Sequence, residues 1–351
     1  EPEPEPKDWV QLGNSINGNT NSGNTGQSVS LSGNGTRIIV GEPYNRDVSS
    51  NSGEIRIYDL SGDTWTQIGN DINGTDKNGR AGWAISLSSD GTHAAMGSPY
   101  RNNNNKLGYV EIYTLSGNTW NKKGNHIISD ISGDETGYSI STSSDGSYIA
   151  IGAPYYVKNG MTQAGRASVY KYENTNWTQV GTDIHGNGYS HRTGWAVSLS
   201  SNGTRLAVAS PNETNSRGKV RIYDLINDSW TQIGDTLEGE ASNNLAGRSI
   251  SLSSDGTHIA IGEPLKSDAG ETYRGQVRIF KYENQNWTQV GDAILGEAAN
   301  DQSGYSSVSL SSNGSHIAIG APYNDGNDSN AGHVRVYKYN NNSWNQLGSD
   351  I

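Results

Sequence analysis

Residues 307–323 read SVSLSSNGSHIAIGAPY, and this stretch decides the fold. Apolar and polar residues alternate before an Asn-Gly pair, and a short apolar run follows it. Alternation with a period of two is typical of a half-buried β-strand. Asn-Gly between two such runs is the strongest short-range signal for a hairpin with a type I′ turn. The pattern occurs six times, from Asn34-Gly35 to Asn313-Gly314, with Asn-Gly or Asp-Gly at its centre. The sequence therefore predicts six equivalent hairpins.

Two further phrases complete each repeat. A polar loop leads to a strand-like run such as GHVRVYKY at 332–339, and a tryptophan phrase such as NSWNQLGSDI at 342–351 closes the unit. Four short strands repeated about every 50 residues are typical of propeller blades. We predict an all-β fold, a six-bladed β-propeller of four-stranded antiparallel blades over residues 26–351, preceded by an extended N-terminal arm over residues 1–25. The repeats are expected at about residues 26–69, 82–124, 137–181, 194–234, 247–291 and 304–348.

Composition narrows the class of protein. The formal net charge is −11 without any basic cluster, so a nucleic-acid partner is not expected. No apolar run approaches the ~20 residues that span a bilayer, so we expect no membrane insertion. The absence of cysteine excludes disulfides and thiol chemistry. A surface rich in Asn, Ser, Thr and Gly favours an extracellular setting, secreted or at the cell surface, and Glu1 is interpreted as a processed start.

The last repeat, IAIGAPY followed by AGHVRVYKY, resembles the FG-GAP repeats of integrin-α-type β-propellers. The Gly-Ala-Pro core is retained at residues 152–154 and 320–322. The resemblance implies the propeller fold. Two features of that family are missing: its Phe-Gly pair, and its Asp-rich calcium loop between the first two strands of a blade. A tight hairpin cannot wrap a cation with six or more oxygens, so we expect no metal ion in that loop and no cofactor.

A search for catalytic groups finds no strong candidate. His93, His258 and His316 share one repeat position and are interpreted as strand residues. Glu42 and Glu263 stand where most other repeats carry Ser or Ala. They could form a carboxylate pair of the kind that glycosidases use, but we favour solvated turn acids. We therefore predict no catalytic residue and no enzyme.

Four aromatic residues share the position that follows a repeated glycine. They could stack on sugar rings, which would make carbohydrate or a cell-surface glycan the partner, or they could pack blade against blade. These ligand-stacking candidates are Trp83, Tyr138, Trp195 and Tyr305.

The chain also contains sequons that permit N-glycosylation in a secretory pathway. The sequons without an assigned turn role are Asn73, Asn176, Asn212, Asn227, Asn286, Asn327 and Asn341.

The tryptophan phrase occurs a seventh time, around Trp9, although the other phrases occur six times. A surplus edge strand could displace Trp344, could join it in a five-stranded blade, or could complete a neighbouring molecule by β-strand addition. We favour the third possibility, which makes a second copy of the chain the partner. The resulting hypothesis is a non-catalytic extracellular structural or adhesive protein that self-associates head-to-tail, with a filament as one form of the assembly. The alternatives are a lectin-like propeller and, third, a glycan-active enzyme. The candidate self-association residues are Trp9, Val10, Leu12, Trp344 and Leu347.

Overall fold

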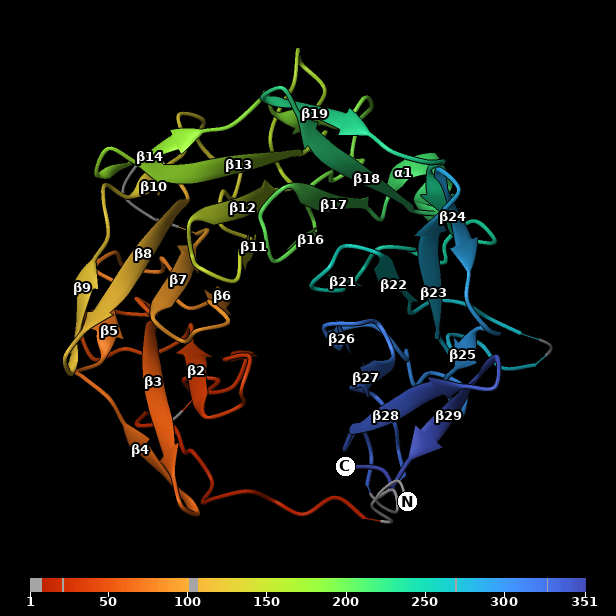
Figure 1. Cartoon of the computed structure of the whole chain (residues 1–351), viewed down its shortest axis with the longest axis horizontal. Coiled ribbons are helices and arrows are strands. Elements are labelled where there is room, and N and C mark those ends of the chain that lie inside the picture. Colours follow the sequence, from red (N-terminus) through yellow and green to blue (C-terminus); the bar gives the residue numbers. More distant parts are fainter. Residues whose placement is uncertain (1–7, 21, 101–106, 269, 327) are drawn as a thin grey trace. The chain divides into compact units, whose positions relative to one another are not determined.

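The computed structural model describes residues 8–20, 22–100, 107–268, 270–326 and 328–351. Within these ranges the chain is all-β, and its strands form six antiparallel sheets that follow one another along the sequence (Figure 1). Each sheet is one blade, and the fold class is the six-bladed β-propeller that the repeats predict.

The strands occupy the same places in every blade. The first strands are β1 (Ser28–Leu31), β6 (Ala84–Leu87), β11 (Ser139–Thr142), β16 (Val197–Leu199), β21 (Ile250–Leu252) and β26 (Val308–Leu310). The second strands are β2 (Arg37–Glu42), β7 (His93–Ser98), β12 (Tyr148–Ala153), β17 (Arg205–Ser210), β22 (His258–Glu263) and β27 (His316–Ala321). The third strands are β3 (Glu54–Ser61), β8 (Tyr109–Ser116), β13 (Arg166–Glu173), β18 (Lys219–Ile226), β23 (Gln276–Glu283) and β28 (His333–Asn340). The fourth strands are β4 (Thr64–Gln67), β9 (Thr119–Lys122), β14 (Asn176–Gln179), β19 (Ser229–Gln232), β24 (Asn286–Gln289) and β29 (Ser343–Leu347).

A short fifth strand pairs with the third strand in five blades. These strands are β5 (Ile72–Asn73), β10 (Ile127–Ile128), β15 (Ile184–His185), β20 (Leu237–Glu238) and β25 (Ile294–Leu295). In the last blade Ile351 exchanges backbone hydrogen bonds of 3.0 and 2.9 Å with Val334 at the equivalent place. The four-residue segment α1 (Glu213–Ser216) has left-handed φ values at Thr214 and Asn215, so it is a turn rather than a regular helix.

The predicted hairpins are confirmed, but the predicted turn type was wrong. Asn34 and its five counterparts, all described residues, do not have a positive φ, which a type I′ turn requires at both central positions. Instead Gly35, at φ 71°, donates its N–H to the Ser32 carbonyl at 2.9 Å. Asn34 Oδ1 accepts hydrogen bonds from Ser32 Oγ at 2.8 Å and Thr36 N at 3.1 Å. Asn or Asp stands here because its side chain is a hydrogen-bond acceptor.

Two consecutive positive φ values, the signature of a type I′ turn, occur instead between the third and fourth strands of the last four blades. In the third blade the pair is Asn174 and Thr175, at 48° and 68°. The equivalent pairs are Asn227 and Asp228, Asn284 and Gln285, and Asn341 and Asn342.

The chain divides into two compact units, which are described separately. One comprises residues 11–203 and 227–230, and the other comprises residues 8–10, 204–226 and 231–351. In both, the apolar side chains of a third strand pack on the first strand of the next blade. Ile57 and Ile85 belong to one such core in the first unit. Ile279 and Val308 belong to another in the second unit. Each such side chain contributes about 1.5–3 kcal/mol by removing apolar surface from water.

The tryptophan phrases form a ladder of indole hydrogen bonds. Each indole Nε1–H donates to the backbone carbonyl of the residue three positions after the preceding anchoring tryptophan; Trp120, for example, donates to Ile68 at 3.2 Å. The other donor–acceptor pairs are Trp65–Leu12, Trp177–Lys123, Trp230–Val180, Trp287–Ile233, Trp344–Val290 and Trp9–Leu347.

The seventh phrase belongs to this ladder at both of its ends. Trp9 Nε1 donates to the Leu347 carbonyl at 3.1 Å in one unit, and the Leu12 carbonyl accepts from Trp65 Nε1 at 3.0 Å in the other. Residues 8–16 form no β-strand, so the expected surplus strand is not present in this part of the chain, and Trp344 keeps its place in β29. The Glu-Pro repeat of the predicted arm lies in residues 1–7, outside the described residues.

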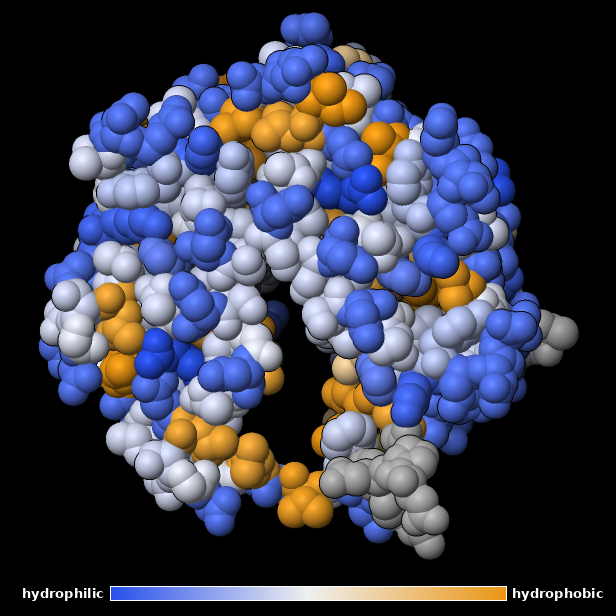
Figure 2. All heavy atoms as spheres, in the orientation of Figure 1, coloured by the Kyte–Doolittle hydropathy of each residue, from blue (hydrophilic) through white to orange (hydrophobic). Residues whose placement is uncertain are grey.

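The face of the molecule in Figure 2 is mostly hydrophilic, with apolar residues in separate small groups. Several candidate self-association residues are exposed, including Trp9 at 41% and Val10 at 87%. In the described residues no helix has the length and apolar character needed to cross a membrane.

Candidate active site

Three turns of the first unit present polar side chains from an unusual backbone conformation. Arg80, Glu135 and Arg192 each precede a repeated glycine by two positions, and their φ values are 56°, 58° and 55°. Left-handed backbone costs a non-glycine residue roughly 1–3 kcal/mol and is concentrated at functional sites. Loop pairing holds it in place, since Arg80 N donates to the Asn51 carbonyl at 3.1 Å and Arg192 N to the Gln163 carbonyl at 2.9 Å.

The same turns carry the predicted aromatic residues. Trp83 N donates to the Arg80 carbonyl at 3.1 Å, and Trp195 N donates to the Arg192 carbonyl at 3.0 Å. Each turn therefore presents one polar and one aromatic side chain together. The structure brings three of the four ligand-stacking candidates into contact, because the Tyr138 ring lies 5.7 Å from the Trp83 ring and 4.7 Å from the Trp195 ring.

The fourth candidate, Tyr305, lies in the other unit. Its ring is 5.6 Å from that of Tyr323. Its hydroxyl accepts a hydrogen bond of 2.9 Å from Arg248 Nη2, and the guanidinium also lies 4.4 Å from the ring centre. A role in stacking on a ligand remains a prediction for all four aromatic residues.

Aromatic rings surround the two arginines. The Arg80 guanidinium lies 4.4 Å from the Tyr100 ring and 4.8 Å from the Tyr44 ring. The Arg192 guanidinium lies 5.1 Å from the Tyr155 ring. Arg80 Nε is buried and has no hydrogen-bond partner, whereas Arg192 Nε donates to Gln163 at 3.2 Å. Buried polar atoms are nearly always paired, so the unpaired Arg80 Nε is unusual among the described residues.

Glu135 is the group with catalytic potential. Burial raises the pKa of its carboxyl to about 7, against the opposing effects of a hydrogen bond from Tyr100 and the charges of Arg80 and Arg192. Its Oε2 atom is buried and has no hydrogen-bond partner. A carboxyl that titrates near neutral pH can accept and return a proton during a reaction. We call Arg80, Trp83, Tyr100, Glu135, Tyr138, Tyr155, Arg192 and Trp195 the Glu135 cluster.

Sequence reasoning did not identify the three polar residues of this cluster. The available signal was the repeat position two residues before the repeated glycine, where the type of side chain differs between blades while the neighbouring positions are similar. That position holds Asn24, Arg80, Glu135, Arg192, Leu245 and Gln302. All six have a positive φ, which nothing in these residue types would reveal.

The two acids that the sequence singled out have a different role from the one expected. Glu42 and Glu263 are almost completely buried, at 1% and 0% exposure, so their interpretation as solvated turn acids was wrong. Glu42 accepts a hydrogen bond of 3.0 Å from Arg56, and Glu263 forms the equivalent ion pair with Arg278. These pairs are structural contacts within their blades.

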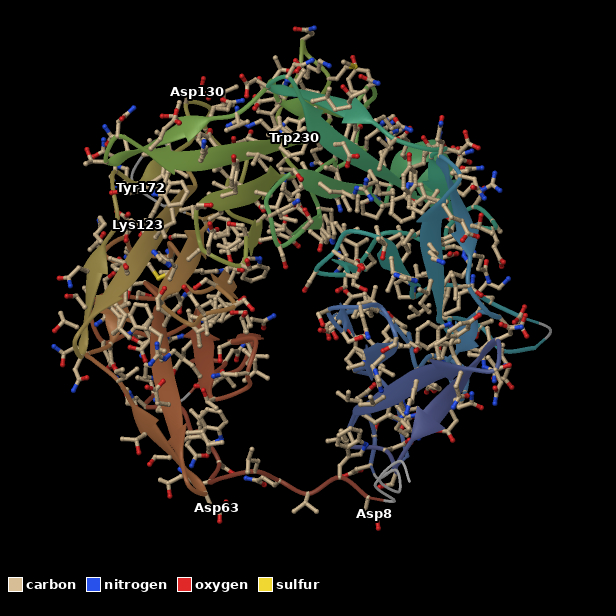
Figure 3. The ribbon with its side chains drawn as sticks, in the orientation of Figure 1. Asp8, Asp63, Lys123, Asp130, Tyr172 and Trp230 are labelled. Atoms are coloured by element: carbon tan, nitrogen blue, oxygen red, sulfur yellow. The ribbon has the colours of Figure 1, made fainter. Side chains whose placement is uncertain are left out.

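The histidines that share one repeat position are strand residues, as predicted: each begins a second strand, as His93 does. The rings of His93 and His258 lie under the hairpin of the next blade, since a Cβ on Gly146 would approach His93 to 2.5 Å and one on Gly314 would approach His258 to 2.5 Å. Lys123 reinforces this contact by donating to the Gly146 carbonyl at 3.3 Å, and its Nζ lies 4.6 Å from the Tyr172 ring. Figure 3 shows Lys123 and Tyr172 side by side.

One cluster of described residues, Glu297, His333 and Asp350, has ligand atoms that all lie within 4.8 Å of one another. Arg335 already forms ion pairs with both carboxylates, at 2.8 Å to Glu297 and 2.7 Å to Asp350. The guanidinium supplies the positive charge that a metal would otherwise bring, so this cluster is a salt-bridge network.

Six of the seven glycosylation candidates are described, and Asn327 is not. Asn176, Asn227, Asn286 and Asn341 are exposed, while Asn73 and Asn212 are half-buried. Their modification remains a prediction.

No family model matches the chain, and no curated protein matches it by sequence. Solved structures do match. A protein assigned as a 6-phosphogluconolactonase from Bacteroides uniformis aligns at 14% identity and a TM-score of 0.63, over 93% of this chain and 85% of its own. The periplasmic gluconolactonase of Pseudomonas aeruginosa aligns at 14% identity and a TM-score of 0.60, over 93% and 84%. The hydrazine synthase of Kuenenia stuttgartiensis aligns at 14% identity and a TM-score of 0.57, over 93% and 80%.

At this identity the likeness establishes the fold, and the resemblance to FG-GAP repeats stays a prediction. The comparison nevertheless overturns two expectations. Two of these propellers are named as lactonases, so the prediction of a non-catalytic structural or adhesive protein was wrong. Head-to-tail self-association was part of that functional prediction; Trp9 and Leu12 take part in hydrogen bonds within their own chain, and a second copy of the chain as partner stays a prediction.

Proposed function

We propose that the protein is a hydrolase that opens a small cyclic ester of a sugar acid, a lactone, with Glu135 as the general base. The observation that carries this proposal is a half-buried carboxyl with a pKa of about 7 and an unpartnered oxygen, placed among arginines and aromatic rings. The names of the two lactonase propellers support the choice of substrate class.

The chemistry follows from the groups present. The Glu135 carboxylate takes a proton from water while the water oxygen bonds to the lactone carbonyl carbon. The bond between that carbon and the ring oxygen then breaks, and the ring oxygen takes the proton back from Glu135. The product is an open-chain hydroxy acid. Arg80 and Arg192 stabilise the negative charge that develops on the carbonyl oxygen.

The aromatic residues supply binding. The rings of Trp83, Tyr138 and Trp195 form a continuous apolar row within the cluster. The weakly polar faces of a sugar ring stack on such side chains. This stacking removes water from the site, and the lower local dielectric constant strengthens the charge interactions around Glu135.

The proposal is tested by following proton release from glucono-δ-lactone at pH 7, with the spontaneous hydrolysis rate subtracted. Glu135→Gln keeps the shape of the side chain and removes the base, so we expect kcat to fall by about 10²–10⁴-fold. The control is Glu173→Gln, which changes an exposed acid on β13 and should leave the rate unchanged.

A wild-type rate equal to the spontaneous rate for glucono-δ-lactone and for its 6-phosphate would overturn the proposal. The same holds if Glu135→Gln retains full activity while the wild-type protein is active. Far-UV and near-UV circular dichroism of both variants excludes loss of folding as the cause.

A further inference from the structure

The first blade contains buried side-chain oxygens without hydrogen-bond partners. They are both carboxyl oxygens of Glu54, the Oδ1 atom of Asn73 and the hydroxyl of Ser49. The Glu54 side chain is completely buried, at 0% exposure. An unpaired buried carboxylate is costly unless an opposite charge accompanies it. All four atoms can accept a hydrogen bond or coordinate a cation.

Strand register brings two of these residues together. Glu54 on β3 lies directly opposite Asn73 on β5 in the antiparallel pair. Side chains at directly opposed positions share one face of the sheet, with Cβ atoms about 5 Å apart. Ser49 belongs to the turn that leads into β3, where Ser52 N donates to the Ser49 carbonyl at 3.1 Å.

The nearby Arg56 is shared between Glu42 and Glu54. Arg56 Nε lies 3.2 Å from Glu54 Oε1 but makes no hydrogen bond to it. The Arg56 Nη2 atom donates to Glu42 at 3.0 Å and to the Asn17 carbonyl at 3.1 Å. Its Nη1 atom donates to the Tyr58 hydroxyl at 2.9 Å. One guanidinium is therefore shared by two buried carboxylates, with a hydrogen bond to Glu42 and an ion pair to Glu54, so two negative charges face one positive charge.

The equivalent place in the fourth blade holds a built-in cation. Lys219 stands at the position of Glu54, and Glu238 stands at the position of Asn73. Lys219 Nζ lies 3.1 Å from Glu238 Oε1 and 3.4 Å from Glu213 Oε1. This blade thus places an ammonium group among oxygens where the first blade places a carboxylate.

Other carboxylates add to the negative charge around Glu54. Asp71 exerts the strongest repulsion on the Glu54 carboxylate, and Glu42 and Asp47 act in the same direction. Arg56 is the group that opposes them. Asp71 lies next to β5 and accepts a hydrogen bond from Gln67 Nε2 at 2.6 Å.

We propose that the first blade binds a Ca²⁺ ion through Glu54 and Asn73, with Asp71 and Ser49 completing the protein side of the site. Carboxylate, amide and hydroxyl oxygens are the ligands that Ca²⁺ takes, in a flexible geometry that water completes. The site lies on β3 and β5, away from the hairpin in which FG-GAP propellers bind calcium. The proposed site can be tested independently of the Glu135 cluster, because Ca²⁺ binding and thermal stability are measured rather than turnover.

The test uses the full chain, freed of metal with EDTA and dialysed. Isothermal titration with CaCl₂ should give one site per chain. An excess of about 100-fold over Kd should raise Tm by roughly 3–6 °C. Parallel titrations with MgCl₂ and NaCl should give weaker binding, since Mg²⁺ demands stricter geometry and Na⁺ has half the charge.

Glu54→Gln is the decisive variant. Glutamine is compatible with the fold here, because Gln276 stands at the same position in the fifth blade. Loss of a group that only orients a metal ligand typically weakens metal affinity by about 10–100-fold, so loss of a direct ligand should weaken Ca²⁺ binding by roughly 100-fold or more. The matched control is Glu283→Gln, an exposed acid on β23, which should bind Ca²⁺ like the wild type.

Absence of Ca²⁺ binding by the wild type at millimolar concentration would overturn the proposal. Unchanged Ca²⁺ affinity in Glu54→Gln, with the variant folded by circular dichroism, would also overturn it, because the ion would then bind elsewhere.

Discussion

Replacing Glu135 with glutamine should make the protein more stable at alkaline pH while removing the proposed base. Burial raises the pKa of this carboxyl from its ordinary value near 4.5 to about 7. A folded-state pKa above the unfolded value means that folding favours the protonated form. The contribution is therefore fully present below about pH 4.5 and is lost as the pH rises through 7.

The magnitude follows from the pKa difference. A pKa change of this size corresponds to about 3 kcal/mol for a fully buried group. Because Glu135 is only half-buried and solvent screens its charge, we expect about half of that value, ~1.5 kcal/mol. Glu135→Gln and the wild type should be equally stable at pH 4.5. At pH 8.5 the variant should be more stable by about 1.5 kcal/mol.

The assay is urea denaturation at several pH values, followed by tryptophan fluorescence. Groups that titrate alike in both proteins cancel in the difference between variant and wild type. Glu173→Gln serves as the control and should follow the wild type throughout. A stability difference that does not change with pH, or one in which the variant is the less stable protein at pH 8.5, would refute the reasoning about Glu135.

Three further substitutions test other parts of the structure. Trp9→Phe removes the indole donor to Leu347 and should lower the free energy of unfolding by about 0.5–1.5 kcal/mol; an unchanged Tm would mean that the arm is not held there. Ile112→Ala empties a fully buried position and should cost about 2–5 kcal/mol in chemical denaturation, whereas a loss below 1 kcal/mol would contradict the packing described for the second blade. His258→Tyr should reduce the loss of stability on acidification below pH 6.5, because burial lowers the pKa of His258 and so favours its neutral form. Tyrosine is compatible with this position, since Tyr148 occupies the equivalent place in the third blade. An acid transition identical to that of the wild type would argue against this role of His258.

The blades could be predicted from sequence because their signals are local and repeated. Period-two alternation, the short apolar runs and the tryptophan phrases locate the four predicted strand classes to within a few residues, whereas the short fifth strands were not predicted. The turn type was missed at Asn34 because the Asn-Gly pair fits two geometries. A left-handed φ and a side-chain acceptor both favour asparagine, and only the backbone distinguishes them.

The candidate site was harder to predict for a physical reason. Trp83, Tyr138 and Trp195 repeat and were found, but Tyr100 and Tyr155 were not singled out. Arg80 and Glu135 act through burial and backbone conformation, which depend on contacts between loops far apart in sequence. The arm shows the same limit. The Trp9 phrase reads like the other six, yet residues 8–16 form no strand, because pairing requires a free sheet edge as well as a suitable sequence.

The six left-handed positions have a consequence for how such a chain can change over time. Each lies in a loop rather than in a strand, so its side chain contributes nothing to the strand pattern on which folding depends. Mutation there exchanges one chemical group for another while the blades remain intact. Asn24, Leu245 and Gln302 can therefore be exchanged for other side chains without compensating mutations in the strands.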